Sequence, residues 1–135
     1  MIEIKDLCAG YGNEEILHNI NLRLELGKVT VLVGKNGCGK STLLKSLIRL
    51  NPHSSGTITV DGQEIEKFKS NELAKKIAYL PQGKTVPDIS VRRMVLHGRF
   101  SYLTYPRRYR KIDYDITENA MRWVGIEDLA EKNMN

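Results

Sequence analysis

The sequence predicts an α/β fold, with strands and helices mixed in residues 1–82 and helices alone in residues 83–135. An apolar run at residues 29–33 leads into a glycine-rich segment, after which leucines recur at helical spacing. Two earlier segments alternate apolar and polar residues, as half-exposed strands of antiparallel sheets do. No strand pattern recurs after Gln82.

Composition fits one modest soluble domain of 135 residues, with 41% hydrophobic and 27% charged residues. No stretch approaches the ~20 apolar residues that span a bilayer. The first residues lack the apolar core of a signal peptide. Cys8 and Cys38 show no metal-site spacing, so we expect reduced thiols in the cytoplasm.

The segments before the glycines are expected to be strands joined by loops. Residues 2–5 alternate as a short strand, and residues 6–13 form a loop. Residues 20–26 alternate as a second strand, and Gly27-Lys28 turns the chain. Residues 29–33 form a nearly continuous apolar run, which predicts a strand covered on both faces.

After the glycines, a helix is expected from Lys40 until Asn51-Pro52 ends it. A hairpin is predicted around a type I′ turn at Asp61-Gly62, with strands at residues 57–60 and 63–65. Ser70 is expected to cap a helix through Lys76, and residues 77–80 to form a strand that stops at Pro81.

The remainder is expected to be helical. Ser90 could cap a helix holding Val91, Met94 and Val95. Asp113 or Thr117 could start a second helix that ends at Gly125. A third helix is expected at residues 127–132.

The segment Gly34 to Ser41 fits the pattern G-x-x-x-x-G-K-[ST]. We expect Gly34, Gly37 and Gly39 to take positive φ, so that successive backbone N–H groups line one concavity. The helix that begins near Lys40 adds its N-terminal donors, Lys40 adds a positive charge, and Ser41 adds a hydroxyl for Mg²⁺. The alternative is a glycine-rich turn without a ligand, which would have no use for the lysines. The predicted nucleotide site comprises Gly34, Lys35, Asn36, Gly37, Cys38, Gly39, Lys40, Ser41 and Thr42.

The opening "IEIKDLCAGYGNEEILHNINLRLELGKVTVLVGKNGCGKSTLLKSL" resembles the nucleotide-binding domain of ABC transporters. In that family an aromatic residue upstream of the loop stacks on adenine, and Tyr11 occupies its position. "SSGTITVDGQEI" resembles the strand pair after the loop helix, and "IAYLPQ" resembles the strand before the family's glutamine loop. The resemblance makes Gln82 that glutamine, which reaches Mg²⁺ and the hydrolytic water. It implies Lys40 and Gln82 as catalytic residues, Ser41 and Gln82 as metal ligands, and ATP with Mg²⁺ as cofactors.

The segment "SVRRMVLHGRFSYL" looks most like the branch that serves iron–siderophore, haem and cobalamin importers. That branch often has proline two residues after the arginine of the Gly-Arg pair, whereas this chain has Gly98-Arg99-Phe100-Ser101.

Several family motifs do not occur in these residues. There is no Leu-Ser-Gly-Gly-Gln signature and no Walker B strand, and no switch histidine can be assigned. The ending "GIEDLAEKNMN" resembles the residues just ahead of the signature. The resemblance therefore implies an incomplete P-loop NTPase fold. Residues 1–82 would be the RecA-like nucleotide-binding core with antiparallel strands, and residues 83–135 the start of the helical subdomain.

The resemblance implies an ATP-binding subunit that couples ATP binding and hydrolysis to transport, with import of an iron–siderophore-type substrate. Its partners would be transmembrane permease subunits, a second ATP-binding subunit in a homodimer and, indirectly, a binding protein. It would lie peripherally on the cytoplasmic face of the membrane. We expect this chain alone to bind nucleotide and hydrolyse it poorly. The alternatives are a non-hydrolysing regulatory module and an ABC-type ATPase of DNA repair or translation.

Residues 89–112 carry seven Lys/Arg and no Asp or Glu, although the chain as a whole has a net charge of +5. One interpretation is a solvated helical face and loop, and another is the family's contact with permease subunits. A positive surface would also favour anionic lipid headgroups. Interleaved aromatic residues suit single-stranded nucleic acid, but we do not expect nucleic acid as a partner.

Overall fold

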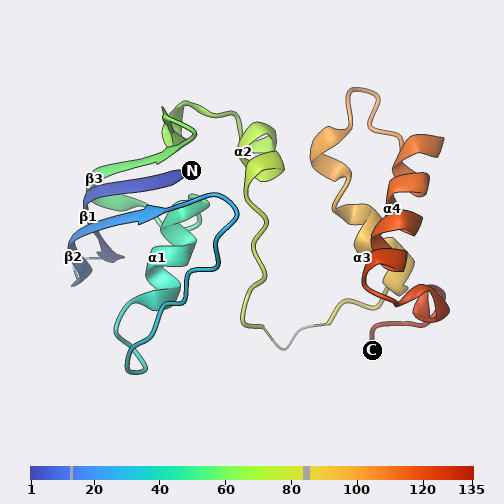
Figure 1. Cartoon of the computed structure of the whole chain (residues 1–135), viewed down its shortest axis with the longest axis horizontal. Helices are drawn as coiled ribbons and strands as arrows, with labels where there is room; N and C mark the ends of the chain where they lie inside the picture. Colours follow the sequence, from blue (N-terminus) through green and yellow to red (C-terminus); the bar gives the residue numbers. More distant parts are fainter. Residues whose placement is uncertain (13, 84–85) are drawn as a thin grey trace. The chain divides into compact units, whose positions relative to one another are not determined.

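A four-stranded antiparallel sheet organises the N-terminal part of the chain, with strand order β2-β1-β3-β4 (Figure 1). The strands are β1 (Ile2–Tyr11), β2 (Glu14–Leu24), β3 (His53–Val60) and β4 (Gln63–Glu64). β1 pairs with both β2 and β3, so its backbone is hydrogen-bonded on both edges. The computed structural model describes residues 1–12, 14–83 and 86–135.

The described chain divides into two units, Met1–Tyr79 and Leu80–Asn135. In the first unit, helix α1 (Lys40–Leu47) packs its apolar side chains against the strands. The apolar side chains of α1 and those of the strands are both buried, and together they form one continuous core that excludes water. The core contains Ile4, Leu7, Ala9, Leu17, Leu43, Leu47, Ile58, Val60, Ile65, Phe68 and Leu73.

The first two strands are longer than the sequence predicts. The predicted loop at residues 6–13 is wrong as far as Tyr11, because β1 continues to that residue, and Asn13 lies outside the described residues. A register shift between Ile4 and Leu7 accommodates Asp6, whose φ is 49°. The Asn21 side chain supports this irregularity, since Asp6 N–H donates to Asn21 Oδ1 at 3.0 Å. This irregularity interrupts the alternation of apolar and polar residues, so the sequence does not show that the strand continues.

The prediction of a buried strand at residues 29–33 is wrong in this structure. The segment is assigned to no strand, and Val29 and Val33 are 93% and 90% exposed. The predicted strand at residues 77–80 is also absent, and Leu80 is exposed. Within the described part of the chain, no strand pairs with either segment. An extended apolar segment needs such neighbours to satisfy its backbone and cover its side chains.

The hairpin and the helix that follow it agree with the sequence prediction. Asp61 and Gly62 have φ of 52° and 82°, as a type I′ turn requires at both central positions. Helix α2 (Ser70–Lys76) begins at Ser70, so the N-cap is Lys69 and the predicted Ser70 cap is one residue late. The backbone N–H of Lys69 donates to Glu72 Oε2 at 2.9 Å, which satisfies one of the free donors there.

The second unit is helical, with α3 (Val91–His97) packed on α4 (Lys111–Trp123). Ser90 caps α3 as predicted, accepting a hydrogen bond from the Arg93 N–H. α4 starts at Lys111, ahead of both predicted starts. Asp113 lies in the first turn of α4 and accepts a hydrogen bond from the backbone N–H of the N-cap residue Arg110 at 2.9 Å, so the helix begins before Asp113. The third predicted helix is only a 3-10 turn, Glu127–Leu129.

A buried carboxylate fixes the start of α4. The N–H of Arg110, followed by the Arg99 guanidinium, lowers the pKa of Asp113 below its ordinary value, so Asp113 stays ionised. Arg99 Nε donates to Asp113 Oδ1 at 3.1 Å and ties the preceding loop to the helix. No helix in the described ranges has both the length and the apolar character needed to cross a bilayer.

Candidate functional site

The glycine loop, residues 34–39, leads directly into α1 (Figure 1). Gly37 and Gly39 have φ of 82° and 93°, in the left-handed region that glycine tolerates. Gly39 is the N-cap of α1, and a Cβ there would lie 2.6 Å from Leu17 Cδ2. Position 39 therefore requires glycine for two reasons: the backbone has a positive φ, and β2 approaches too closely to leave room for a Cβ.

Gly34 differs from the other two glycines. The prediction of positive φ at Gly34 is wrong, since its φ lies outside that region. A Cβ at this position would lie 2.7 Å from Cys38 Sγ, so the absence of a side chain lets the loop fold back on itself. Cys38 N–H donates to the carbonyl of Lys35 at 3.4 Å and closes this turn.

The Lys40 ammonium sits inside the turn of the loop. Its Nζ donates to the carbonyl oxygens of Gly34 and Lys35, both at 2.7 Å, and lies 3.5 Å from Cys38 Sγ. The side chain thus folds back along the loop, which places a positive charge among its backbone groups. This position suits an ammonium that neutralises a bound anion.

Most backbone donors of the loop are not used within the protein. Of the N–H groups from residue 34 to residue 42, all of them described, only that of Cys38 donates to a backbone carbonyl. The first internal bond of α1 is from Leu43 N–H to the Gly39 carbonyl at 2.9 Å. Exposed N–H groups at a helix N-terminus form an anion-binding surface, and the helix dipole adds to it.

The two hydroxyl residues at the start of α1 face different surroundings. Ser41 is exposed, so its hydroxyl is available to a ligand or metal ion. Thr42 is buried, so its side chain belongs to the packing of the first unit, and its backbone carbonyl accepts a hydrogen bond from Ser46 Oγ at 3.0 Å. In the described ranges, no group of three His, Cys, Asp or Glu residues could hold a metal ion. A metal here would depend on Ser41 and on oxygens of the bound ligand.

The structure brings Tyr11 to the same helix. Tyr11 ends β1, its side chain is 48% exposed, and Lys45 Nζ lies 5.8 Å from its ring centroid. Lys45 is four residues after Ser41 and so lies one turn along the same side of α1. The aromatic ring and the loop therefore border one surface of the first unit. Lys45 is not among the predicted site residues, although its position four residues after Ser41 places it on the same side of the predicted helix.

Gln82 belongs to the second unit, where it is exposed and outside any helix or strand. Its role as a ligand or catalytic residue stays a prediction. Lys35 and Asn36 are exposed at the tip of the loop.

A recess at the end of the β1–β2 hairpin contains none of the predicted site residues. It has a volume of about 280 Å³ and contains Glu15, whose pKa is lowered mainly by a hydrogen bond with His18. Glu15 Oε1 and His18 Nδ1 are 2.7 Å apart. The alternation of polar residues in β2 could have indicated an exposed charged face. The recess is lined by Gly10, Gly12, Glu14, Glu15, Pro52, His53 and Ser54.

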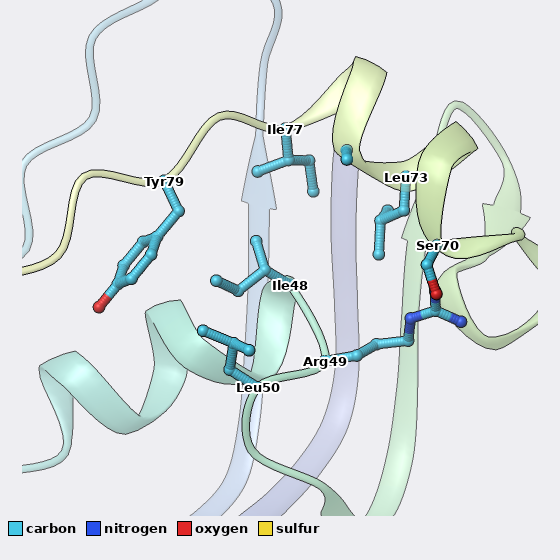
Figure 2. A pocket seen from close by; sticks show the side chains of 8 residues that line it. Ile48, Arg49, Leu50, Ser70, Leu73, Ile77 and Tyr79 are labelled. Carbon is cyan, nitrogen blue, oxygen red and sulfur yellow. The ribbon is translucent and has the colours of Figure 1, made fainter. Parts of the chain in front are cut away.

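A separate apolar pocket lies between the end of α1 and α2, with a volume of about 420 Å³ (Figure 2). Figure 2 shows the side chains of Ile48, Leu73 and Ile77 approaching one another across it. Arg49 borders the pocket and is held in place, since its Nη1 donates to the Phe68 carbonyl at 3.0 Å. None of the predicted site residues lines this pocket, so it is distinct from the loop.

Comparison with known proteins identifies the family. Residues 17–135 match the ABC transporter family. The chain belongs to the ABC transporter family. The resemblance stated from the sequence is thereby confirmed, and so is the fold class of a P-loop NTPase fragment.

Curated relatives of this ABC family chain include ATP-binding proteins of siderophore import. The chain is 38% identical over 132 residues to the probable siderophore transport system ATP-binding protein YusV of Bacillus subtilis (strain 168), covering 97% of this chain and 48% of the relative. It is 36% identical over 132 residues to the ferric enterobactin transport ATP-binding protein FepC of Escherichia coli (strain K12), covering 97% and 49%. The chain therefore spans about half the length of these relatives.

Solved structures of the family show the same fold. The ABC transporter subunit cbiO1 from Clostridium perfringens, part of the complex cbiONQ, matches with a TM-score of 0.79 and 26% identity. The match covers 98% of this chain and 53% of cbiO1. The ATP-binding cassette MJ0796 bound to ADP and Pi matches with a TM-score of 0.77 and 21% identity, covering 100% and 62%, and supports the fold alone.

Proposed function

We propose that this chain is the nucleotide-binding part of an ABC import ATPase and that its glycine loop holds the phosphates of ATP. The observation that carries this proposal is the placement of the Lys40 ammonium within the loop at the start of α1. The unused N–H groups of residues 34–42 would donate to the phosphate oxygens. Mg²⁺ would contribute charge neutralisation, with Ser41 as its ligand from the loop helix.

Tyr11 supports an adenine nucleotide over inorganic phosphate. A half-exposed aromatic ring next to α1 gives a planar base a surface on which to stack. Lys45 lies near the same ring and adds positive charge beside the phosphate site. The family resemblance implies a further role for Gln82, whose side chain would coordinate Mg²⁺ and hydrogen-bond to the attacking water.

The transport role rests on the relatives. YusV and FepC are named for siderophore transport and ferric enterobactin transport, and both match almost the whole of this chain. We therefore assign it to import of an iron–siderophore-type substrate. Its partners would be permease subunits, a second copy in an ATP-binding dimer and, through the permease, a binding protein. It would act on the cytoplasmic face of the membrane.

The 135 residues supply the phosphate-binding part of the chemistry but not all of it. They contain no Leu-Ser-Gly-Gly-Gln run and no apolar strand ending in Asp-Glu after the loop. Phosphoryl transfer needs a positioned water and charge stabilisation around the transferred group. We therefore expect this chain alone to bind MgATP and to release phosphate very slowly.

Two measurements on the purified chain test this proposal. Equilibrium dialysis with labelled ATP should show saturable, Mg²⁺-dependent binding, which inorganic phosphate at the same concentration should not displace. Phosphate release should stay far below the ~1 s⁻¹ of ordinary enzymes. Absence of saturable binding would refute the nucleotide site, and turnover near that rate would refute the predicted inability to hydrolyse ATP.

A further inference from the structure

The loop between α3 and α4 gathers cations and aromatic rings on the surface of the second unit. Tyr105 is 96% exposed and Phe100 is 50% exposed. Arg107, Arg108 and Arg110 are exposed beside them, and residues 89–112 contain no Asp or Glu. The loop is thus both the most basic segment of the chain and one in which aromatic rings face solvent.

Three acidic side chains of this unit, Asp113, Glu118 and Glu131, are paired with other arginines. Arg92 forms ion pairs with Glu118 and Glu131, and Arg99 pairs with Asp113. Across the described ranges, no carboxylate forms an ion pair with the four remaining cations of the loop and the helix start, namely Arg107, Arg108, Arg110 and Lys111. The Arg110 charge also helps to lower the pKa of Asp113, so the charges of Arg107, Arg108 and Lys111 are the ones left for whatever the loop meets in solution.

A recess of about 600 Å³ lies at the base of this loop. Phe100, Leu103 and Tyr109 give it apolar walls, and Arg107 places a guanidinium at its edge. The arrangement combines an apolar hollow with an adjacent cation. A phospholipid has groups that complement both features, since its phosphate can pair with the cation and its apolar acyl region can contact the hollow.

We propose that residues 98–111 form a docking surface for a bilayer containing anionic phospholipids. Arginine and lysine near such a surface are attracted by its negative potential, and tyrosine and phenylalanine partition into the headgroup region. Arg107, Arg108, Arg110 and Lys111 contact lipid phosphates, while Tyr105 enters the interface. The interaction is direct and does not depend on nucleotide or on a permease.

The packing of the rings favours lipid over single-stranded nucleic acid. Arg107 lies over Phe100 at 4.9 Å, and Arg99 lies over Tyr102 at 3.9 Å, each measured to the ring centroid. One face of each ring is therefore covered by the protein's own guanidinium. Recognition of single strands relies on open aromatic faces on which bases stack, whereas a lipid interface requires only exposed apolar and cationic surface.

Vesicle flotation with the full chain tests the proposal. The chain should float with vesicles of phosphatidylglycerol and phosphatidylcholine and remain behind with phosphatidylcholine alone, and added salt should weaken the binding. The variant R107Q/R108Q/R110Q should lose about 100-fold in partition coefficient, from roughly fivefold per arginine. The control K5Q/K28Q/K67Q removes the same charge from exposed lysines that pair with neighbouring glutamates, and it should bind like the unaltered chain.

A spectroscopic variant separates insertion from simple charge attraction. Y105W in a W123F background places the sole tryptophan at the loop tip, and its emission should shift to the blue on anionic vesicles. Circular dichroism of each variant should match that of the unaltered chain. Equal loss of binding in both triple variants, an unshifted emission, or tighter binding to a single-stranded oligonucleotide than to vesicles would overturn the proposal.

Discussion

The Lys40 ammonium and the Gly34 carbonyl oxygen are 2.7 Å apart, so the lysine at the end of the glycine loop closes onto its first residue. This hydrogen bond holds the charge inside the turn. The same ammonium also reaches the Lys35 carbonyl, and the backbone N–H groups around it remain available. If the loop binds ATP as proposed, Lys40 affects both the loop conformation and the affinity for ATP, and several variants can separate the two.

Gly39→Ala should destabilise the first unit more than Gly37→Ala does. Both positions have positive φ, which costs a non-glycine residue about 1–2 kcal/mol. At Gly39 the new Cβ would also lie 2.6 Å from Leu17, whereas nothing lies within 4 Å at Gly37. Such overpacking adds about 1–3 kcal/mol. Urea unfolding of the two variants should show this difference, and equal free energies of unfolding would show that β2 yields to the new methyl group.

Tyr11→Ala should weaken ATP binding, whereas Tyr11→Phe should preserve it. Stacking of a base on an aromatic ring contributes about 1–3 kcal/mol, and phenylalanine retains the ring. Affinity for inorganic triphosphate should be the same in all three proteins, because Tyr11 would contact only the base. Titration calorimetry with both ligands checks this. If Tyr11→Ala weakens triphosphate and ATP binding equally, Tyr11 supports the loop and does not stack on adenine.

Asp61 should make the first unit sensitive to acid. Hydrogen bonds from Lys76 and from the N-terminal ammonium lower its pKa to about 2. Because the folded pKa is below the ordinary value, the unfolded chain binds the proton more readily as pH falls. The stabilisation is therefore present above the ordinary pKa of 3.8 and is lost as pH falls toward 2.

Urea unfolding of the unaltered chain and of Asp61→Asn measures this effect. The unaltered chain should be more stable at neutral pH, and the difference should shrink through this acidic window. A difference that does not change with pH would mean that the Asp61 carboxylate contributes through its shape alone.

The exposed valines of residues 29–33 should cause self-association. Val29 and Val33 present apolar surface on an extended segment without a strand neighbour among the described residues. Such surface is a template for pairing with another chain. Sedimentation velocity should show oligomers, and V29K/V33K should shift the chain toward monomer. The control Q63K/N71K adds the same charge at exposed polar positions and should leave the distribution unchanged.

The sequence predicts the parts of the fold that local chemistry determines. Asp61-Gly62 specifies its hairpin turn, and Ser90 specifies the start of α3, because each depends on residues only a few positions away. The glycine loop is predictable for the same reason. Gly37 and Gly39 adopt the conformation that only glycine takes without strain, and Lys40 is close enough in sequence to fold back onto Gly34.

The errors arise where structure depends on distant partners. β1 continues through Asp6 because β2 and β3 hydrogen-bond to it on both sides, which no local pattern reveals. Residues 29–33 have the composition of a buried strand, but composition does not supply the neighbouring strands. The contact between Tyr11 and Lys45 likewise joins segments that are remote in the sequence.

The most direct test of the nucleotide site is the ATP affinity of Lys40→Ala, measured by titration calorimetry with Mg²⁺. Loss of a charged hydrogen-bond donor costs about 1.5–3 kcal/mol, so the affinity should fall roughly 10- to 100-fold. Lys28→Ala removes the same charge from a lysine paired with Glu25, and it should bind ATP as the unaltered chain does. Equal ATP affinity in Lys40→Ala and the unaltered chain would contradict the account.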